Sequence, residues 1–173
     1  KTAHIATGAT VYDTAGSPHV VTLFFNKIDE NGGWTWRAMA KGEEVVGGTP
    51  GKLIEQASGK LIFDTDGRLK DQQVDKSSFN FKGGALPDQA ITFNFGNDKT
   101  KGGDGLSVTQ YGTESEAYKT LQDGYQAGTL NGLTFNDDGM LSAIYSNGET
   151  ISVAQIALAK FENPEGLFKM GQN

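Results

Sequence analysis

The 173-residue chain has no cysteine, only two histidines and only four prolines. Without cysteine it can form no disulfide, no thiolate nucleophile and no cysteine-based metal site. His4 and His19 are the only imidazoles, so a histidine-rich metal site cannot be assembled, and the G-x-S-x-G nucleophile motif is missing. These absences remove most local signatures of catalysis. We therefore predict no enzyme activity, no cofactor and no metal.

Long apolar runs and a surplus of positive charge are missing as well. The apolar runs fall far short of the ~20 residues that a membrane-spanning helix needs. Fifteen basic and 21 acidic residues give a formal net charge of −6, which repels phosphate backbones and anionic lipid. We predict no nucleic-acid partner and no membrane insertion. Because the chain begins with Lys1 and shows no apolar signal segment, we expect it to be a piece of a longer protein.

Glycine is abundant, at 24 residues, which is roughly twice its average share. Between glycine-rich turns, the chain alternates β-branched and aromatic residues with polar ones, a pattern typical of short antiparallel strands. A hairpin is predicted over residues 10–25, around a turn at 14–18, and a further strand over 34–39. Other strands are predicted at 78–82, 90–95 and 151–161, and helical turns only near 114–121. Two β units are expected to join near residue 122.

One pattern, L-x-F-[DN]-x-D-G-x-L, occurs twice, at residues 61–69 and 133–141. It predicts a strand, an Asx turn whose glycine adopts positive φ, and a returning strand. Asp64 and Asp66 resemble the start of a calcium-binding loop, but the third acidic ligand and the closing glutamate are missing. The pattern therefore favours two hairpins of the same design.

Two alternatives to a purely structural protein remain open at this point. Trp34 and Trp36 lie on one strand face, near Phe24 and Phe25, and a sugar-binding sandwich would expose them side by side. We favour a core role, since the chain has few large apolar side chains. A glycoside hydrolase needs two converging carboxylates, for which no local signature exists. His19, beside Pro18 at a strand start, is interpreted as structural.

Several motifs resemble the bacterial flagellar hook proteins. Residues 10–19 read T-V-Y-D-T-A-G-S-P-H and resemble the T-V-Y-D-S-L-G-x-S-H opening of that family's middle domain. Residues 122–130 are similar to its Q-D-G-Y-x-x-G-x-L segment, 145–148 to Y-S-N-G, 158–167 to L-A-x-F-x-N-P-x-G-L, and 171–173 to G-x-N. The motif positions that we take as candidate intersubunit positions are Tyr12, Asp13, Gly16, Gly124, Tyr125, Gly128, Asn147, Gly148, Asn163, Pro164 and Gly166.

The resemblance implies a mainly β fold with very little helix. Residues 1–121 would form the outer (middle) domain, an antiparallel hairpin-rich β-barrel or sandwich. Residues 122–173 would form the carboxy-terminal portion of the inner β domain. The family's terminal helical segments, and the amino-terminal strand segment that completes its inner domain, have no counterpart in this sequence. We therefore expect the isolated fragment to be monomeric.

The function that the resemblance implies is structural. Such subunits build the hook, a flexible helical tube that couples the motor rod to the filament and transmits torque. The implied partners are other copies of the chain, the rod, hook cap and hook–filament junction proteins, and the flagellar type III export apparatus. The implied location is extracellular, after export without a cleaved signal peptide. Because neighbouring subunits in a bending tube must slide, we expect the polar loops 41–51 and 97–105 to face neighbours or solvent.

Overall fold

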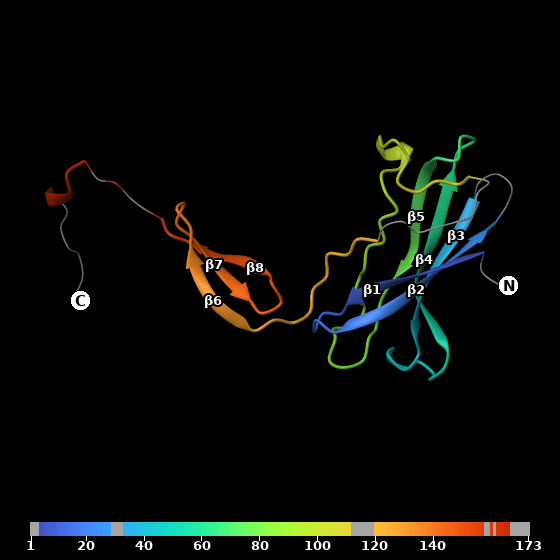
Figure 1. The fold of residues 1–173 in the computed structure, drawn as a ribbon, viewed down its shortest axis with the longest axis horizontal. Helices are drawn as coiled ribbons and strands as arrows, with labels where there is room; N and C mark the ends of the chain where they lie inside the picture. Colours follow the sequence, from blue (N-terminus) through green and yellow to red (C-terminus); the bar gives the residue numbers. More distant parts are fainter. Residues whose placement is uncertain (1–3, 29–32, 112–119, 158–159, 161, 167–173) are drawn as a thin grey trace. The chain divides into compact units, whose positions relative to one another are not determined.

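The computed structural model describes residues 4–28, 33–111, 120–157, 160 and 162–166. Contacts divide the chain into two compact units, residues 1–127 and 128–173. The first unit holds one antiparallel sheet in the order β1-β2-β3-β4-β5, and the second holds a three-stranded sheet in the order β6-β7-β8 (Figure 1). The strands are β1 (Ile5–Tyr12), β2 (Pro18–Lys27), β3 (Gly33–Lys41), β4 (Leu53–Phe63), β5 (Leu69–Ser77), β6 (Leu130–Phe135), β7 (Met140–Tyr145) and β8 (Thr150–Gln155).

Helix is confined, in the described residues, to two single turns, η1 (Lys99–Lys101) and η2 (Pro164–Gly166). The predicted fold class is therefore confirmed: the chain is mainly β, antiparallel and rich in hairpins. The helical turns predicted near 114–121 lie almost entirely outside the described residues. No described helix is long and apolar enough to cross a membrane.

The same turn closes four hairpins, two in each unit. In each turn, the N–H of the first residue, i, donates to the carbonyl of residue i+4. Residue i+3 is a glycine, and its N–H donates to the carbonyl of residue i. This is a type I turn followed by a positive-φ residue, the three-residue hairpin loop. The pairs of first residue and glycine are Asp13 with Gly16, Asp64 with Gly67, Asn136 with Gly139, and Tyr145 with Gly148.

The repeated pattern at 61–69 and 133–141 forms two of these hairpins, as predicted. The Asp64 Oδ1 atom accepts the N–H of Asp66 and of Arg68, both at 2.9 Å. The corresponding Asn136 Oδ1 accepts the Met140 N–H at 2.8 Å. These side chains act as turn formers, which confirms the Asx interpretation.

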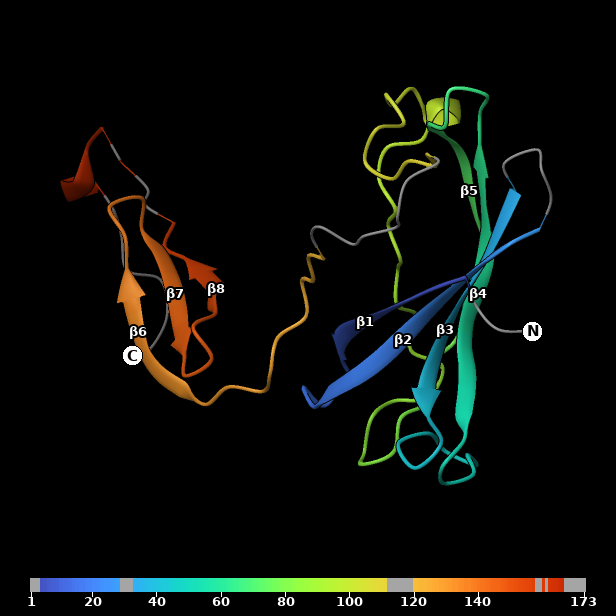
Figure 2. The same ribbon diagram turned by 45° about the vertical axis from the view of Figure 1, so that its right-hand side comes forward.

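The core of the first unit lies on one face of its sheet. The buried side chains on this face include Val21, Trp36, Ala57, Leu61 and Leu69. Irregular chain between residues 78 and 110 covers them, as its green and yellow trace shows (Figure 2). Phe93 and Phe95 from this cover each place a ring centroid 5.3 Å from that of Trp36. The second layer of the unit is thus irregular chain with aromatic side chains directed into the core.

Two predicted strands are absent from this cover. Residues 90–95 alternate in exposure, with 91, 93 and 95 turned inward, but they join no ladder. Side chains of β5 bind their backbone instead: Ser77 Oγ donates to the Ile91 carbonyl at 2.7 Å, and Gln72 Oε1 accepts the Phe95 N–H at 3.2 Å. Residues 78–82 make only isolated bridges. The alternation here reflects burial of one side of an extended segment and not strand pairing.

The strand predicted at 151–161 is shorter than expected, since β8 ends at Gln155. Positions 158, 159 and 161 fall outside the described residues. The register of the second sheet places Leu133, Ala143 and Ile151 opposite one another on one face, with Phe135 and Leu141 beside them. The other face carries mostly polar or small residues. Among the described residues of this unit only Ala143 is a buried hydrophobic residue, so the apolar face is open.

Candidate functional site

The predicted motif positions gather at four places. Tyr12, Asp13 and Gly16 lie at the β1–β2 turn, and Gly124 and Tyr125 lie in the connector, defined as residues 120–127. Gly128, Asn147 and Gly148 lie at one end of the second unit, and Asn163, Pro164 and Gly166 at η2. The structure brings the first two groups together, a contact that nothing in the sequence predicted.

Asp13 organises the β1–β2 turn from inside. Its side chain is fully buried. Its Oδ1 accepts the N–H of Ala15 at 2.9 Å and of Ser17 at 2.8 Å, and its Oδ2 lies 3.0 Å from Nε2 of His19. Burial by itself would raise the pKa of Asp13, but the hydrogen bonds from His19, Ser17 and Ala15 outweigh it, so the pKa is lowered. The carboxylate is therefore ionised at neutral pH.

His19 lies between two carboxylates. Its Nδ1 is 3.0 Å from Glu44 Oε2, across the ring from Asp13, and the ring stacks on Phe81 with centroids 3.8 Å apart and planes 4° apart. With an N–H on both nitrogens, the ring can donate to both carboxylates. We call Asp13, His19 and Glu44 the His19 stack. Both ring nitrogens of His19 thus face carboxylates, which supports the structural interpretation of this residue.

The connector packs against the same turn. The Ala127 N–H donates to the Gly16 carbonyl at 3.3 Å. Gly124 lies so close to Tyr12 that a Cβ added at Gly124 would be 2.9 Å from Tyr12 Cδ2. Tyr125, by contrast, is half exposed. Gly124 is thus required by close approach, since any larger residue would push the connector off the Tyr12 ring.

The motif positions of the second unit also meet within that unit. Gly128 lies against the Asn147 side chain, where a Cβ would be 2.7 Å from Asn147 Cγ. Asn147 Oδ1 accepts the Glu149 N–H at 3.1 Å in the β7–β8 turn. Farther along, the Gly166 N–H donates to the Asn163 carbonyl at 3.2 Å, which closes η2. An intersubunit role for any of these residues remains a prediction.

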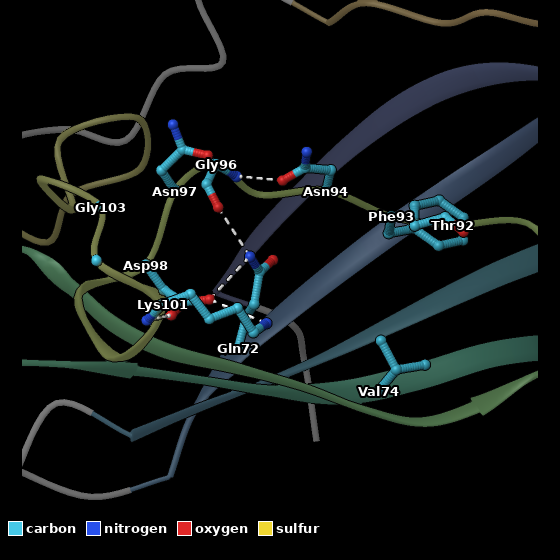
Figure 3. Close-up of a pocket in the computed structure, with 11 residues that line it drawn as sticks. Gln72, Val74, Thr92, Phe93, Asn94, Gly96, Asn97, Asp98, Lys101 and Gly103 are labelled. Atoms are coloured by element: carbon cyan, nitrogen blue, oxygen red, sulfur yellow. Dashed lines mark hydrogen bonds and ion pairs between the residues drawn. The ribbon is translucent and has the colours of Figure 1, made fainter.

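An open groove of about 610 Å³ lies between β5 and the 92–103 segment. Figure 3 shows Gln72, Asp98 and Lys101 joined at one end of the groove and Phe93 and Val74 at the other. Asp98 is fully buried and caps η1: it accepts the Thr100 hydroxyl at 2.6 Å, the Lys101 N–H at 2.9 Å and the Gln72 amide at 3.2 Å. The Thr100 hydroxyl first, and then the Lys101 and Gln72 contacts, lower the pKa of Asp98 to about 2.

The groove lacks the chemistry of a glycoside hydrolase. Among the residues that line it, Asp98 is the one carboxylate, and with its pKa near 2 it stays ionised and cannot act as a general acid. Both of its oxygens are occupied: Oδ1 accepts the Thr100 hydroxyl, and Oδ2 lies 3.2 Å from Lys101 Nζ. Sequence reasoning marked the 97–105 loop as polar but missed Asp98 as its organising residue. The cap signal was there, an Asp directly before the turn, but nothing pointed to Gln72.

The tryptophans do not form a sugar-binding platform. Trp36 is completely buried, and Trp34 packs against the core while its Nε1–H donates to Gln110 Oε1 at 2.9 Å. Side-by-side exposure, which the sugar-binding alternative requires, is therefore contradicted. The core interpretation of this pair is confirmed.

Comparison with known proteins assigns the chain to a family. The sequence model of one protein family, the flagellar basal body protein FlaE D2 domain, matches residues 1–125 of this chain. The flagellar hook protein FlgE of Helicobacter pylori is 35% identical over 171 residues, which cover 97% of this chain and 23% of that protein. The FlgE of Treponema pallidum is 30% identical over 195 residues, covering 94% of this chain and 40% of that protein. The chain thus spans well under half the length of these relatives.

A solved structure gives the same result for the fold. The crystal structure of Helicobacter pylori flagellar hook protein FlgE2 matches 96% of this chain and 35% of that chain, with a TM-score of 0.54 and 18% identity. Together with the match over residues 1–125, the two-sheet architecture and the motif positions lead to one assignment. The chain belongs to the family of the flagellar basal body protein FlaE D2 domain.

Proposed function

We propose that this chain is part of the structural subunit of the bacterial flagellar hook, the flexible helical tube that couples the motor rod to the filament and transmits torque. The observation that carries the proposal is that relatives named flagellar hook protein FlgE align over 94% and 97% of the chain. The occupied polar groups of the groove and the buried tryptophans support a structural protein without catalytic activity.

Residues 1–121 are proposed to be the outer domain, and residues 122–173 the carboxy-terminal portion of the inner β domain. Support for the second part comes from the open face of its sheet, where Leu133 is 59% and Phe135 58% exposed. A contiguous exposed apolar face of this kind marks a surface that another segment or partner covers. We propose that a preceding segment of the longer parent chain covers it. The expectation that the isolated chain is monomeric stays a prediction. If the chain did self-associate, this exposed apolar face is the surface through which two copies would bind.

The proposed partners follow from the hook assignment. They are other copies of the subunit in a helical polymer, the rod, hook cap and hook–filament junction proteins, and the type III export apparatus, which would deliver the subunit outside the cell without a cleaved signal. The loops 41–51 and 97–105 are largely exposed, with Val45 and Asp98 anchoring them inward. This exposure supports the proposal that polar loops contact neighbouring subunits, because small polar contacts permit sliding.

Deleting the encoding gene in the source bacterium is expected to abolish hooks and motility, because no rod can then be joined to a filament. Electron microscopy of isolated basal bodies would show rods without hooks, and supplying the intact gene in trans would restore them. Hooks of normal length and number in the deletion strain would contradict the proposal.

A further inference from the structure

The β1–β2 turn, residues 13–17, is a meeting point for segments far apart in the sequence. Its Thr14 hydroxyl accepts the Leu86 N–H at 2.6 Å, and just before it the Tyr12 carbonyl accepts the Gln89 side-chain amide at 3.0 Å. The His19 stack adds Glu44 from the loop after β3. The connector adds the contacts of Gly124 and Ala127. Three separate stretches of chain therefore converge on one short turn.

The shape of this turn depends on the Asp13 carboxylate. That carboxylate accepts two of the turn's own N–H groups and contacts His19, whose other nitrogen faces Glu44. A buried carboxylate that loses a hydrogen-bond partner bears the full cost of its desolvation. Disturbing His19 or Glu44 therefore acts on the same carboxylate that holds Ala15 and Ser17 in place: His19 contacts its Oδ2 atom, and the two N–H groups donate to its Oδ1 atom.

The connector touches the turn at the residues that this carboxylate fixes. Gly16, whose carbonyl accepts the Ala127 N–H, lies between Ala15 and Ser17, the two residues bonded to Asp13 Oδ1. Tyr12, which packs on Gly124, directly precedes Asp13. A change in the conformation of the turn consequently moves both contact points of the connector together.

We propose that the His19 stack is a positioning device: it keeps the 13–17 turn in the shape that docks the connector against the first unit. Asp13, His19 and Glu44 are positioning residues in this account, and Tyr12, Gly16, Gly124 and Ala127 form the docking contact. The inference concerns contacts within the first unit and does not depend on the proposed place of the chain in the hook.

The test measures backbone ¹⁵N order parameters of Gly124 and Ala127 in the 173-residue chain. In the unchanged protein we expect both to approach the rigid-backbone value of about 0.85, and in His19→Gln and Glu44→Gln to fall below about 0.6. Ala38 and Ala57, which are buried in the sheet, report whether the core stays folded. Glu43→Gln is the matched control, because the exposed Glu43 carboxylate hydrogen bonds to backbone N–H groups, its own and that of Gly51 at 3.3 Å, and lies outside the His19 stack.

If His19→Gln unfolds the sheet, the Glu44→Gln variant still tests whether the stack holds the connector. This substitution preserves the size of the side chain and removes one charge at the edge of the stack. Gly124→Val tests the docking contact directly, and we expect it to mobilise Ala127 while the stack stays intact. Two results would overturn the proposal. One is a flexible connector in the unchanged protein, and the other is an Ala127 order parameter that stays high in Glu44→Gln or Gly124→Val.

Discussion

Replacing Trp36 with alanine is expected to lower the free energy of unfolding of the first unit by about 3–5 kcal/mol, the range for truncating a fully buried tryptophan. Trp36 is 0% exposed and contacts Phe93 and Phe95, so the truncation opens a cavity between the sheet and its cover. Its buried Nε1–H has no hydrogen-bond partner among the described residues. The loss therefore measures packing and not a hydrogen bond.

Urea unfolding followed by far-UV circular dichroism measures the effect without relying on tryptophan fluorescence. Val20→Ala is the matched control, because Val20 is 53% exposed on β2 and its truncation opens no cavity. We expect that variant to unfold within about 0.5 kcal/mol of the unchanged protein, as surface substitutions usually do. A Trp36→Ala variant as stable as Val20→Ala would show that Trp36 is not the centre of the core.

Replacing Gly59 with valine is expected to destabilise the first unit by about 3 kcal/mol, the upper part of the usual range for overpacking. Gly59 pairs with Trp36 across β3 and β4. A Cβ at Gly59 would overlap the Gln73 carbonyl of β5 and lie 2.7 Å from Trp36 Nε1. Because the carbonyl is backbone in a paired strand, it cannot move away without breaking the β4–β5 ladder.

Gly8→Val provides the comparison for Gly59→Val. Gly8 also lies in a strand, β1, but a Cβ there meets nothing within 4 Å. Since valine has the higher strand propensity, we expect Gly8→Val to be neutral or slightly stabilising. The urea midpoints of the two variants test how tight the Gly59 contact is. Equal midpoints would mean that the contact is not tight, whereas a midpoint of Gly59→Val well below that of Gly8→Val would support the prediction.

The hairpins could be predicted because their determinants are local. Asp64 and Gly67 are three residues apart, and together they specify the turn that the structure shows, as do Asn136 and Gly139. The cover of the sheet could not be predicted in the same way. Alternation at 90–95 records which side chains face the core, whereas a ladder requires a partner strand at the right distance, and Ser77 and Gln72 hold the segment by their side chains instead.

The candidate site, too, could be predicted only in part: the sequence marked its positions but not the contacts between them. The family resemblance marked Tyr12, Gly16 and Gly124, but not that Tyr12 would meet Gly124 and Gly16 would meet Ala127, because more than 100 residues separate the partners in the sequence. The partners of His19 could not be predicted from the sequence either, since Glu44 is 25 positions away and Phe81 contacts the ring from the irregular cover. Such contacts follow from tertiary packing, which one sequence does not reveal.

Immunogold electron microscopy on cells of the source bacterium tests the central claim most directly. Antibodies raised against the 173-residue chain, with the gene-deletion strain as control, would be applied to cells with intact flagella. The hook assignment predicts gold particles confined to the short curved segment between the cell surface and the filament. Unlabelled hooks beside label on the filament, the cell surface or the cell interior would contradict it.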